Sequence, residues 1–236
     1  MNLSSNEIPA AFDVGAPAYD KLVDANPGYH MHLRLSAQRM QIPNGGKGLR
    51  LLDAGCGTGA STAALLTAAP QAEIVAVDAS GGMLAQARAK SWPSSVSFVQ
   101  SRIEDLADVG VSAPFDGILA AYLVRNVDDK DGQLRRFREL LRPGGTLAVH
   151  EYSVRDSKLA MAVWNTVCAA VIIPSGRLRT GDASLYTYLR RSVNRFDGVR
   201  AFCNRMQSNG FEDVRSETMP GWQRNIVHTF LGRSPR

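Results

Sequence analysis

The sequence predicts an α/β fold built on a doubly wound, mostly parallel sheet. Between about residues 48 and 152, short apolar runs alternate with amphipathic stretches. A glycine-rich turn follows the first apolar run, and two strand-like segments close the chain. Continuous apolar strands that alternate with helices are typical of a parallel sheet covered on both faces. We therefore expect one domain over residues 1–236, with its ligand-binding edge at the carboxyl ends of the strands.

The segment 48–152 is expected to form the ligand-binding core. Short apolar runs predict five strands, Leu49–Ala54, Glu73–Asp78, Val96–Gln100, Phe115–Tyr122 and Thr146–Tyr152. Helical patterns predict Ala60–Ala69, ended by Pro70, then Gly82–Lys90, ended near Pro93, and Lys130–Leu141, ended by a turn at Arg142–Gly145.

The pattern changes after Tyr152. Residues 153–197 are predicted to form a helical insertion over the ligand edge, with Pro174, Gly176 and Gly181 in a loop. The first 47 residues are expected to be helical and to lie on the substrate side.

The segment 198–236 is predicted to close the fold. It contains the helical pattern Gly198–Asn209 and two strand patterns, Phe211–Thr218 and Gln223–Leu231, divided by Pro220 and Gly221. Two strands after a helix fit a hairpin at one sheet edge, which gives seven strands with an antiparallel C-terminal strand.

With 44% of its 236 residues hydrophobic, the chain can bury a sizeable core. Its odd number of widely separated cysteines favours a reduced, cytoplasmic protein. The longest apolar candidate, Ala160–Pro174, is interrupted by Asn165 and Thr166 and is interpreted as a buried or amphipathic helix. The N-terminus lacks the basic and apolar regions of a secretory signal. The three cysteines are far apart in the sequence, so neither a disulfide framework nor a metal site is expected.

The net charge of +5 is unevenly distributed. Residues 177–236 contain 11 arginines against five acidic residues. A basic segment suits an anionic ligand, a membrane surface or nucleic acid, but these arginines are dispersed and no nucleic-acid recognition motif accompanies them. A solvated, arginine-rich surface is the favoured interpretation, and no nucleic-acid partner is expected.

The glycine-rich turn DAGCGTG follows the first predicted strand. Its glycines, Gly55, Gly57 and Gly59, let backbone approach a ligand closely. A P-loop would require Lys-Ser/Thr after its last glycine, and none is present. Asp53 would repel a pyrophosphate, whereas a cationic sulfonium and an ammonium group would tolerate it. Asp78 can accept hydrogen bonds from a ribose diol, although NAD sites use a carboxylate in the same way.

The sequence DAGCGTG, followed by VDAS, resembles the class I S-adenosylmethionine-dependent methyltransferases. Three further stretches resemble the ubiquinone/menaquinone-biosynthesis C-methyltransferases. These are LVRNVDDKDGQLRRFRELLRPGGTLAVHEYS at Leu123–Ser153, IPSGRLRTGDASLYTYLRRSV at Ile173–Val193, and GYH at Gly28–His30, which is preceded by Phe12–Asp20. The resemblance implies a Rossmann-like fold and S-adenosylmethionine as the methyl donor.

The resemblance also implies a set of cofactor contacts. Arg102 departs from the family pattern, since Asn or Asp there would accept a hydrogen bond from the adenine amine, and Ala121 replaces a frequent serine. Met83 fits either an adenine face or a helix core. The expected cofactor residues are Asp53, Gly55, Gly57, Gly59, Thr62, Asp78, Ala79, Met83, Arg102, Ile103, Ala121 and Tyr19.

For the reaction, the resemblance implies a ring carbon of a reduced quinone as acceptor. Ionisation of a ring hydroxyl makes the neighbouring carbon nucleophilic, so the site needs a group that stabilises a phenolate and a route for protons. Arg125 and Asn126 are the expected catalytic pair, with His30 as a proton acceptor. The alternative is structural: Asn126 caps a helix, Arg125 pairs with Asp128 or Asp129, and His30 has no role in the chemistry. The expected substrate contacts are Tyr122, Glu151, Tyr186, Tyr188 and His228.

The identity of the acceptor stays open at this point. A demethylmenaquinone-like quinol, another prenylated quinol and an aromatic secondary metabolite all suit the pattern. Two other hypotheses compete with carbon methylation. One is methyl transfer to oxygen or nitrogen, and the other is a non-catalytic protein that binds S-adenosylmethionine. Peripheral membrane contact and a homodimer are both compatible with the sequence.

Overall fold

The computed structural model describes the chain apart from residues 1–12, 14–15, 17–18, 22, 25 and 181–182. Its centre is a seven-stranded sheet in the order β3-β2-β1-β4-β5-β7-β6, in which β7 runs antiparallel to both of its neighbours. This arrangement confirms the predicted fold class. The strands are β1 Arg50–Ala54, β2 Glu73–Asp78, β3 Val96–Gln100, β4 Phe115–Ala121, β5 Leu141–Tyr152, β6 Glu212–Thr218 and β7 Val227–Arg233.

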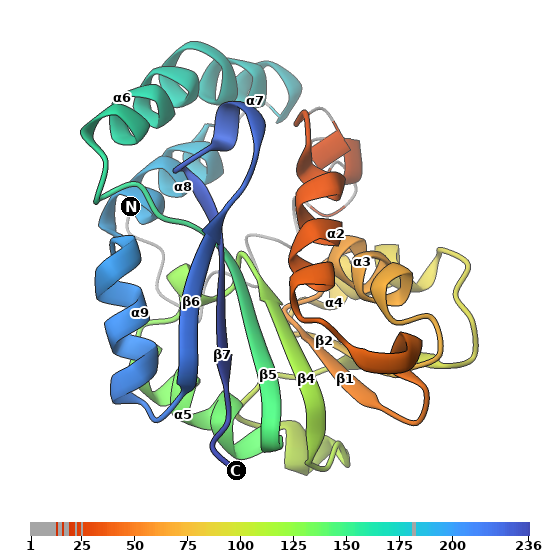
Figure 1. Ribbon diagram of the computed structural model, residues 1–236. Coiled ribbons are helices and arrows are strands. Elements are labelled where there is room, and N and C mark those ends of the chain that lie inside the picture. Colours follow the sequence, from red (N-terminus) through yellow and green to blue (C-terminus); the bar gives the residue numbers. More distant parts are fainter. Residues whose placement is uncertain (1–12, 14–15, 17–18, 22, 25, 181–182) are drawn as a thin grey trace.

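Helices cover both faces of the sheet (Figure 1). Neighbouring residues of β1 show this, because Leu51 packs with α2 (Tyr29–Arg39) and α3 (Ala60–Ala68), whereas Leu52 lies in the core with α5 (Lys130–Leu140) and α9 (Val199–Ser208). Both leucines are fully buried, which explains the continuous apolar run in the sequence. Helix α4 (Gly81–Arg88) follows β2.

Two strands begin several residues away from their predicted starts. Strand β5 begins at Leu141, so Arg142–Gly145, the predicted turn, lies inside an irregular strand whose pairing with β4 shifts register between Phe115 and Gly117. Strand β7 begins at Val227 rather than Gln223, because Asn225 has a φ of 61°, which an extended strand does not allow.

The insertion is helical, as expected, but its predicted loop is wrong. Pro174 and Gly176 lie within α7 (Ile173–Thr180), whereas Gly181 lies outside the described residues. A proline removes one helix hydrogen bond and crowds the carbonyl four residues earlier. The wider π-helical turn Cys168–Ile172 comes directly before α7 and accommodates this change.

The helix α6 (Lys158–Val167) continues through that turn into α7 and lies across the top of the molecule, with α8 (Ser184–Arg195) below it (Figure 1). By length and composition alone, the stretch Lys158–Leu178 is long and apolar enough to cross a membrane, with a mean hydropathy of 1.6 over an 18-residue window. It exceeds the predicted Ala160–Pro174 segment because Pro174 does not end the helix. One helix of this kind is weak evidence for a membrane span.

Candidate functional site

The glycine loop joins β1 to α3 at the carboxyl edge of the sheet. Gly55, Gly57 and Gly59 all have positive φ, at 72°, 55° and 91°. Residues that carry a side chain rarely adopt these backbone angles, so the loop requires glycine at these positions. The Gly55 amide donates to the carbonyl oxygen of Val77 at 2.8 Å, which fixes the loop against the end of β2.

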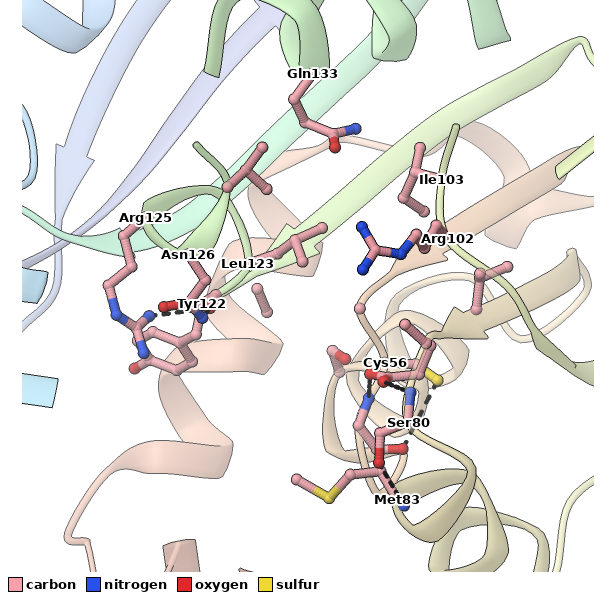
Figure 2. Close-up of a pocket in the computed structure, with 18 of the residues that line it drawn as sticks. Cys56, Ser80, Met83, Arg102, Ile103, Tyr122, Leu123, Arg125, Asn126 and Gln133 are labelled. Carbon is pink, nitrogen blue, oxygen red and sulfur yellow. Dashed lines mark hydrogen bonds between the residues drawn. The ribbon is translucent and has the colours of Figure 1, made fainter. Parts of the chain in front are cut away.

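A cavity of about 540 Å³, here called the loop cavity, opens beside this loop. Figure 2 shows Cys56, Ser80 and Met83 on one side, Tyr122 and Leu123 on the other, and the Arg102 guanidinium between them. Most of the predicted cofactor residues line it. They are Gly55, Gly57, Asp78, Ala79, Met83, Arg102, Ile103, Ala121 and Tyr19.

Asp78 ends β2 at the wall of the loop cavity. Its Oδ2 accepts a hydrogen bond from the Gly57 amide at 2.8 Å, and its Oδ1 accepts one from the Ser80 amide at 2.8 Å. Burial raises the pKa of Asp78, while these two amides oppose that shift. The Ala79 amide also lowers this pKa, so at least one of the roughly four acceptor positions of the carboxylate remains for a ligand.

Three predicted cofactor residues, Asp53, Thr62 and Gly59, lie behind the cavity wall rather than on it. Asp53 is fully buried, and its Oδ2 accepts hydrogen bonds from the Ser61 hydroxyl at 2.8 Å and the Thr62 hydroxyl at 2.6 Å. Burial raises the pKa of Asp53 to about 7. Gly59 sits against Trp92, whose ring a Cβ at position 59 would meet at 2.7 Å. These residues hold the start of α3. The Asp53 carboxylate does not face the loop cavity, so it would not repel a pyrophosphate there by direct contact, as the sequence had suggested.

A second cavity of about 570 Å³, here called the ring cavity, lies under the insertion. Tyr19, Tyr29, Tyr122 and Arg125 line both cavities and therefore form a shared wall. The other lining residues are mainly aliphatic and aromatic: Val23, Asn26, Pro27, Tyr152, Val163, Val167, Val171, Ile172, Ser175, Tyr186, Tyr188, Leu189 and Trp222.

The Arg125 side chain, only 7% exposed, is the one cation among the described residues that line the ring cavity. Its Nη1 donates to Glu151 Oε1 at 2.9 Å and to the Tyr122 carbonyl oxygen at 3.0 Å. Burial alone would lower the pKa of Arg125, but the Glu151 carboxylate raises it above its ordinary value. Its Nε has no hydrogen-bond partner in the described part of the chain. The guanidinium carbon lies 5.7 Å from the ring centres of both Tyr122 and Tyr152.

Asn126 links the two cavities through hydrogen bonds. Its Nδ2 donates to the Tyr122 carbonyl oxygen at 3.1 Å, and its Oδ1 accepts from the Tyr188 hydroxyl at 3.1 Å. Tyr122 has a φ of 56°, a strained value for a bulky residue, and its ring stacks on that of Tyr29 with centroids 5.7 Å apart. Tyr186 packs directly over Gly176. The predicted Tyr122, Tyr186 and Tyr188 thus meet at one cavity.

Three of the predicted catalytic and substrate residues do not line either cavity. His30 is on the exposed side of α2, where its Nε2 lies 2.7 Å from Asp24 Oδ1. Glu151 is fully buried behind Arg125, and burial raises its pKa. His228 is buried on β7, where its Nδ1 lies 3.3 Å from the Ser216 hydroxyl. Direct contact of these three side chains with a substrate is therefore not supported by the structure.

Tyr29 and Tyr152 line the ring cavity, although neither was predicted from the sequence as a site residue. Tyr29 begins α2 and belongs to its buried stripe with Leu33 and Ala37, whereas His30 points about 100° away around the helix. The periodicity of α2 was the signal that could have identified Tyr29. Arg125 pairs with Glu151 rather than with Asp128 or Asp129, so the predicted structural alternative for this arginine is wrong in its partner.

Metal ligands do not gather in the described residues, which contain no group of three His, Cys, Asp or Glu side chains suited to an ion.

The model of the ubiE/COQ5 methyltransferase family matches residues 1–228. A Syntrophotalea carbinolica protein named ubiquinone/menaquinone biosynthesis C-methyltransferase UbiE is 33% identical over 94% of this chain and 91% of its own. Its Bradyrhizobium diazoefficiens namesake is 30% identical over 87% and 83%.

Solved structures share the fold at low sequence identity. The [4+2]-cyclase SpnF aligns with a TM-score of 0.70 at 16% identity, over 98% of this chain and 96% of its own. The plantazolicin methyltransferase BamL, solved in complex with a triazolic desmethylPZN analog and SAH, aligns with a TM-score of 0.66 at 11% identity, over 98% of both chains.

Proposed function

Because the chain belongs to the ubiE/COQ5 methyltransferase family, we propose that it methylates a ring carbon of a reduced quinone. Membership of the family makes the chain an S-adenosylmethionine-dependent methyltransferase. The relatives carry the name of ubiquinone/menaquinone biosynthesis C-methyltransferases, which supports carbon as the acceptor atom. The acceptor proposed here is a quinol ring that carries an apolar tail.

The loop cavity fits the cofactor. Asp78 lines this cavity and keeps acceptor capacity on its carboxylate, which suits a hydroxyl group of a ribose diol. Met83 and Ile103 are almost fully buried and line the same cavity, so they offer apolar faces to a purine ring. Arg102 offers donors but no acceptor, so the adenine amine would be read by other groups. S-adenosylmethionine, when bound, supplies an electrophilic methyl group.

The observation that carries the proposal is the ring cavity and its single known lining cation. Tyrosine rings and aliphatic side chains suit a flat aromatic ring and an alkyl tail. The Arg125 guanidinium lies where the two cavities meet. Its Nε is buried away from both cavities and its Nη1 already donates twice, so Nη2 is the atom left to donate a hydrogen bond to a ligand there. A phenolate oxygen placed there would accept this hydrogen bond.

The chemistry of the site follows from this arrangement. Arg125 would stabilise the ionised ring hydroxyl, and the negative charge on the ring would make the adjacent carbon nucleophilic. Arg125 cannot act as the base, because its pKa is raised above an already high value. Two protons must leave: the hydroxyl proton before the transfer, and the hydrogen of the methylated ring carbon after it, which restores the aromatic ring. Asn126 keeps a second N–H and spare acceptor capacity, so it would orient a water molecule that accepts these protons. The surrounding tyrosines exclude bulk water.

The test combines product analysis with variants. The protein would be incubated with isotopically labelled S-adenosylmethionine and a reduced naphthoquinone bearing a short prenyl tail. NMR of the product should show loss of a ring hydrogen and a methyl group on carbon. Transfer only to hydroxyl groups, or no transfer at all, would contradict the proposal.

The variants locate the chemistry. Arg125→Met should reduce turnover about 10²- to 10³-fold, the usual effect of losing one anion-stabilising donor, with little change in cofactor affinity. Arg135→Met, which alters a half-exposed arginine on α5, is the matched control. If Arg125→Met alone folds poorly, the pair Arg125→Met/Glu151→Gln removes both buried charges. Undiminished turnover in these variants would return Arg125 to a structural role.

A further inference from the structure

The outer face of the helix Lys158–Leu178 is apolar and exposed to solvent. No charged residue lies between Lys158 and Arg177 in the sequence. Leu159, Val171 and Leu178 are 75%, 55% and 92% exposed. A helix on the surface of a water-soluble protein normally presents charged and polar residues outward. We call these three residues, together with the exposed Ala162, Ala169, Ala170 and Pro174, the outer apolar face; the hydroxyl-bearing Thr166 is the one uncharged polar side chain exposed among the described residues of this helix.

The inner face of the same helix packs on the protein. Trp164 and Cys168 are fully buried in a core cluster with Tyr152 and Val193. A helix that packs along one side lies flat against the rest of the protein. To cross a membrane it would have to leave this packing and expose the core cluster. Only 22% of the most apolar window is buried, which leaves most of its length available to another surface.

The ring cavity reaches the surface beside the outer apolar face. Val163, Val167 and Ile172 line the cavity from this helix. Val171 both lines the cavity and is 55% exposed, and Trp222, which is 38% exposed, also lines it. A single helix therefore provides one apolar surface to the cavity and a second to the outside, with Val171 between them.

The charges around this face are mainly positive. Lys158 and Arg177 are exposed at its two ends, and Arg155 is exposed just before it. The nearby carboxylate of Asp156 already accepts a hydrogen bond from the Arg200 amide. Basic residues that border an apolar helix face complement anionic headgroups above an acyl layer.

The size of the face argues for lipid over a second copy of the chain. A 21-residue helix is about 30 Å long and about 10 Å wide, so the face offers roughly 300 Å². A stable protein interface buries about 800 Å² on each partner. Insertion of one helix face into a lipid surface has no such requirement, because binding scales with whatever apolar area is buried.

We propose that the outer apolar face docks on an anionic lipid surface, with the helix parallel to that surface and the ring cavity opening toward the lipid. Docking itself does not depend on the methyl transfer. Its use, which rests on the proposed function, is to let the apolar tail of the acceptor pass from the lipid into the ring cavity without crossing water.

The test is co-sedimentation of the whole chain with vesicles. Phosphatidylcholine vesicles that contain phosphatidylglycerol should bind the protein at least tenfold more tightly than vesicles of phosphatidylcholine alone. The double variant Leu159→Glu/Leu178→Glu should lose at least tenfold in binding, since it places two charges in the face. The control Val109→Glu/Ala85→Glu adds the same charge at exposed apolar positions outside the helix and should bind within twofold of wild type.

Three results would overturn the docking proposal. These are no vesicle binding by the wild-type chain, equal binding by the Leu159→Glu/Leu178→Glu variant, or a dimer in sedimentation equilibrium that this variant abolishes. Methylation of a water-soluble quinol without a tail separates the two proposals, since neither Leu159 nor Leu178 lines a cavity. A variant that loses vesicle binding but keeps this activity supports docking. A wild-type chain that binds vesicles but methylates no quinol supports docking and refutes the proposed function.

Discussion

The ion pair between Arg125 and Glu151 should be strongly coupled, and a double-mutant cycle can measure the coupling. The two side chains are 7% and 0% exposed, with 2.9 Å between Arg125 Nη1 and Glu151 Oε1. Removal of either partner leaves a buried charge without compensation. The variants are Arg125→Met, Glu151→Gln and the combination of both, and the measured quantity is the free energy of unfolding in urea at pH 7.

The expected magnitude follows from the geometry. Charge centres about 4 Å apart, in a medium with an effective dielectric constant of about 20, attract each other by about 4 kcal/mol. Breaking a buried pair from one side typically costs about 3–5 kcal/mol, whereas replacing both partners costs far less. Each single variant should therefore lose about 3 kcal/mol, and the double variant should be at least about 2 kcal/mol more stable than the sum of the two losses predicts.

The pH dependence of Arg125→Met provides a second readout. Burial already raises the pKa of Glu151, and loss of the neighbouring cation raises it further. In the unfolded chain this carboxyl has a pKa near its ordinary value of 4.5. Above that pH the folded variant holds a proton that the unfolded chain has released, so its stability should fall as the pH rises toward the folded pKa. A coupling below about 0.5 kcal/mol, or an Arg125→Met variant without this extra decline, would refute the reasoning.

Three further predictions concern the cofactor, the core and the ring cavity. Asp78→Ala should weaken binding of S-adenosylhomocysteine by about 1–3 kcal/mol in calorimetry, and unchanged affinity would remove this residue from the ribose role. His150, whose pKa burial lowers to about 3, stays neutral in the fold while the unfolded chain gains a proton below pH 6.5. Between pH 7 and 5, His150→Gln should thus lose about 2 kcal/mol less stability than wild type in urea titrations; an equal loss would contradict the assignment. Gly176→Ala should press a methyl group into the Tyr186 ring and raise the KM for the quinol while the Kd of the cofactor is unchanged; a KM equal to wild type would show that Tyr186 does not shape the ring cavity.

The parallel sheet could be predicted because its central strands are buried on both faces. Such strands appear as continuous apolar runs, and the ranges predicted for β2 and β3 match the structure. The helix through Pro174 could not be predicted in this way, because a proline normally ends or kinks a helix and the compensating π-helical turn leaves no clear pattern in the sequence.

The sequence predicted the kind of site and many of its residues, but not the direction in which each side chain points. Asp53 and Asp78 both lie near strand ends, but Asp53 precedes one more strand residue, and its side chain turns under α3, while Asp78 faces the loop cavity. The sequence alone does not show on which side of the loop each carboxylate falls. Likewise, Arg125 was identified from the resemblance, whereas its buried partner 26 positions later depends on the pairing of β4 with β5.

The wall that the two cavities share has a consequence for how the enzyme could acquire a new acceptor. Tyr19, Tyr29, Tyr122 and Arg125 each face both chambers. A ligand in one chamber that shifts any of these side chains changes the affinity of the other chamber, and thermodynamic reciprocity requires the same factor in the opposite direction. A substitution that moves one of these tyrosine rings to fit a different acceptor therefore also alters how the methyl donor is held. Evolution toward a new acceptor is less constrained through residues that line the ring cavity alone, such as Val167 and Leu189, than through the four residues of the wall.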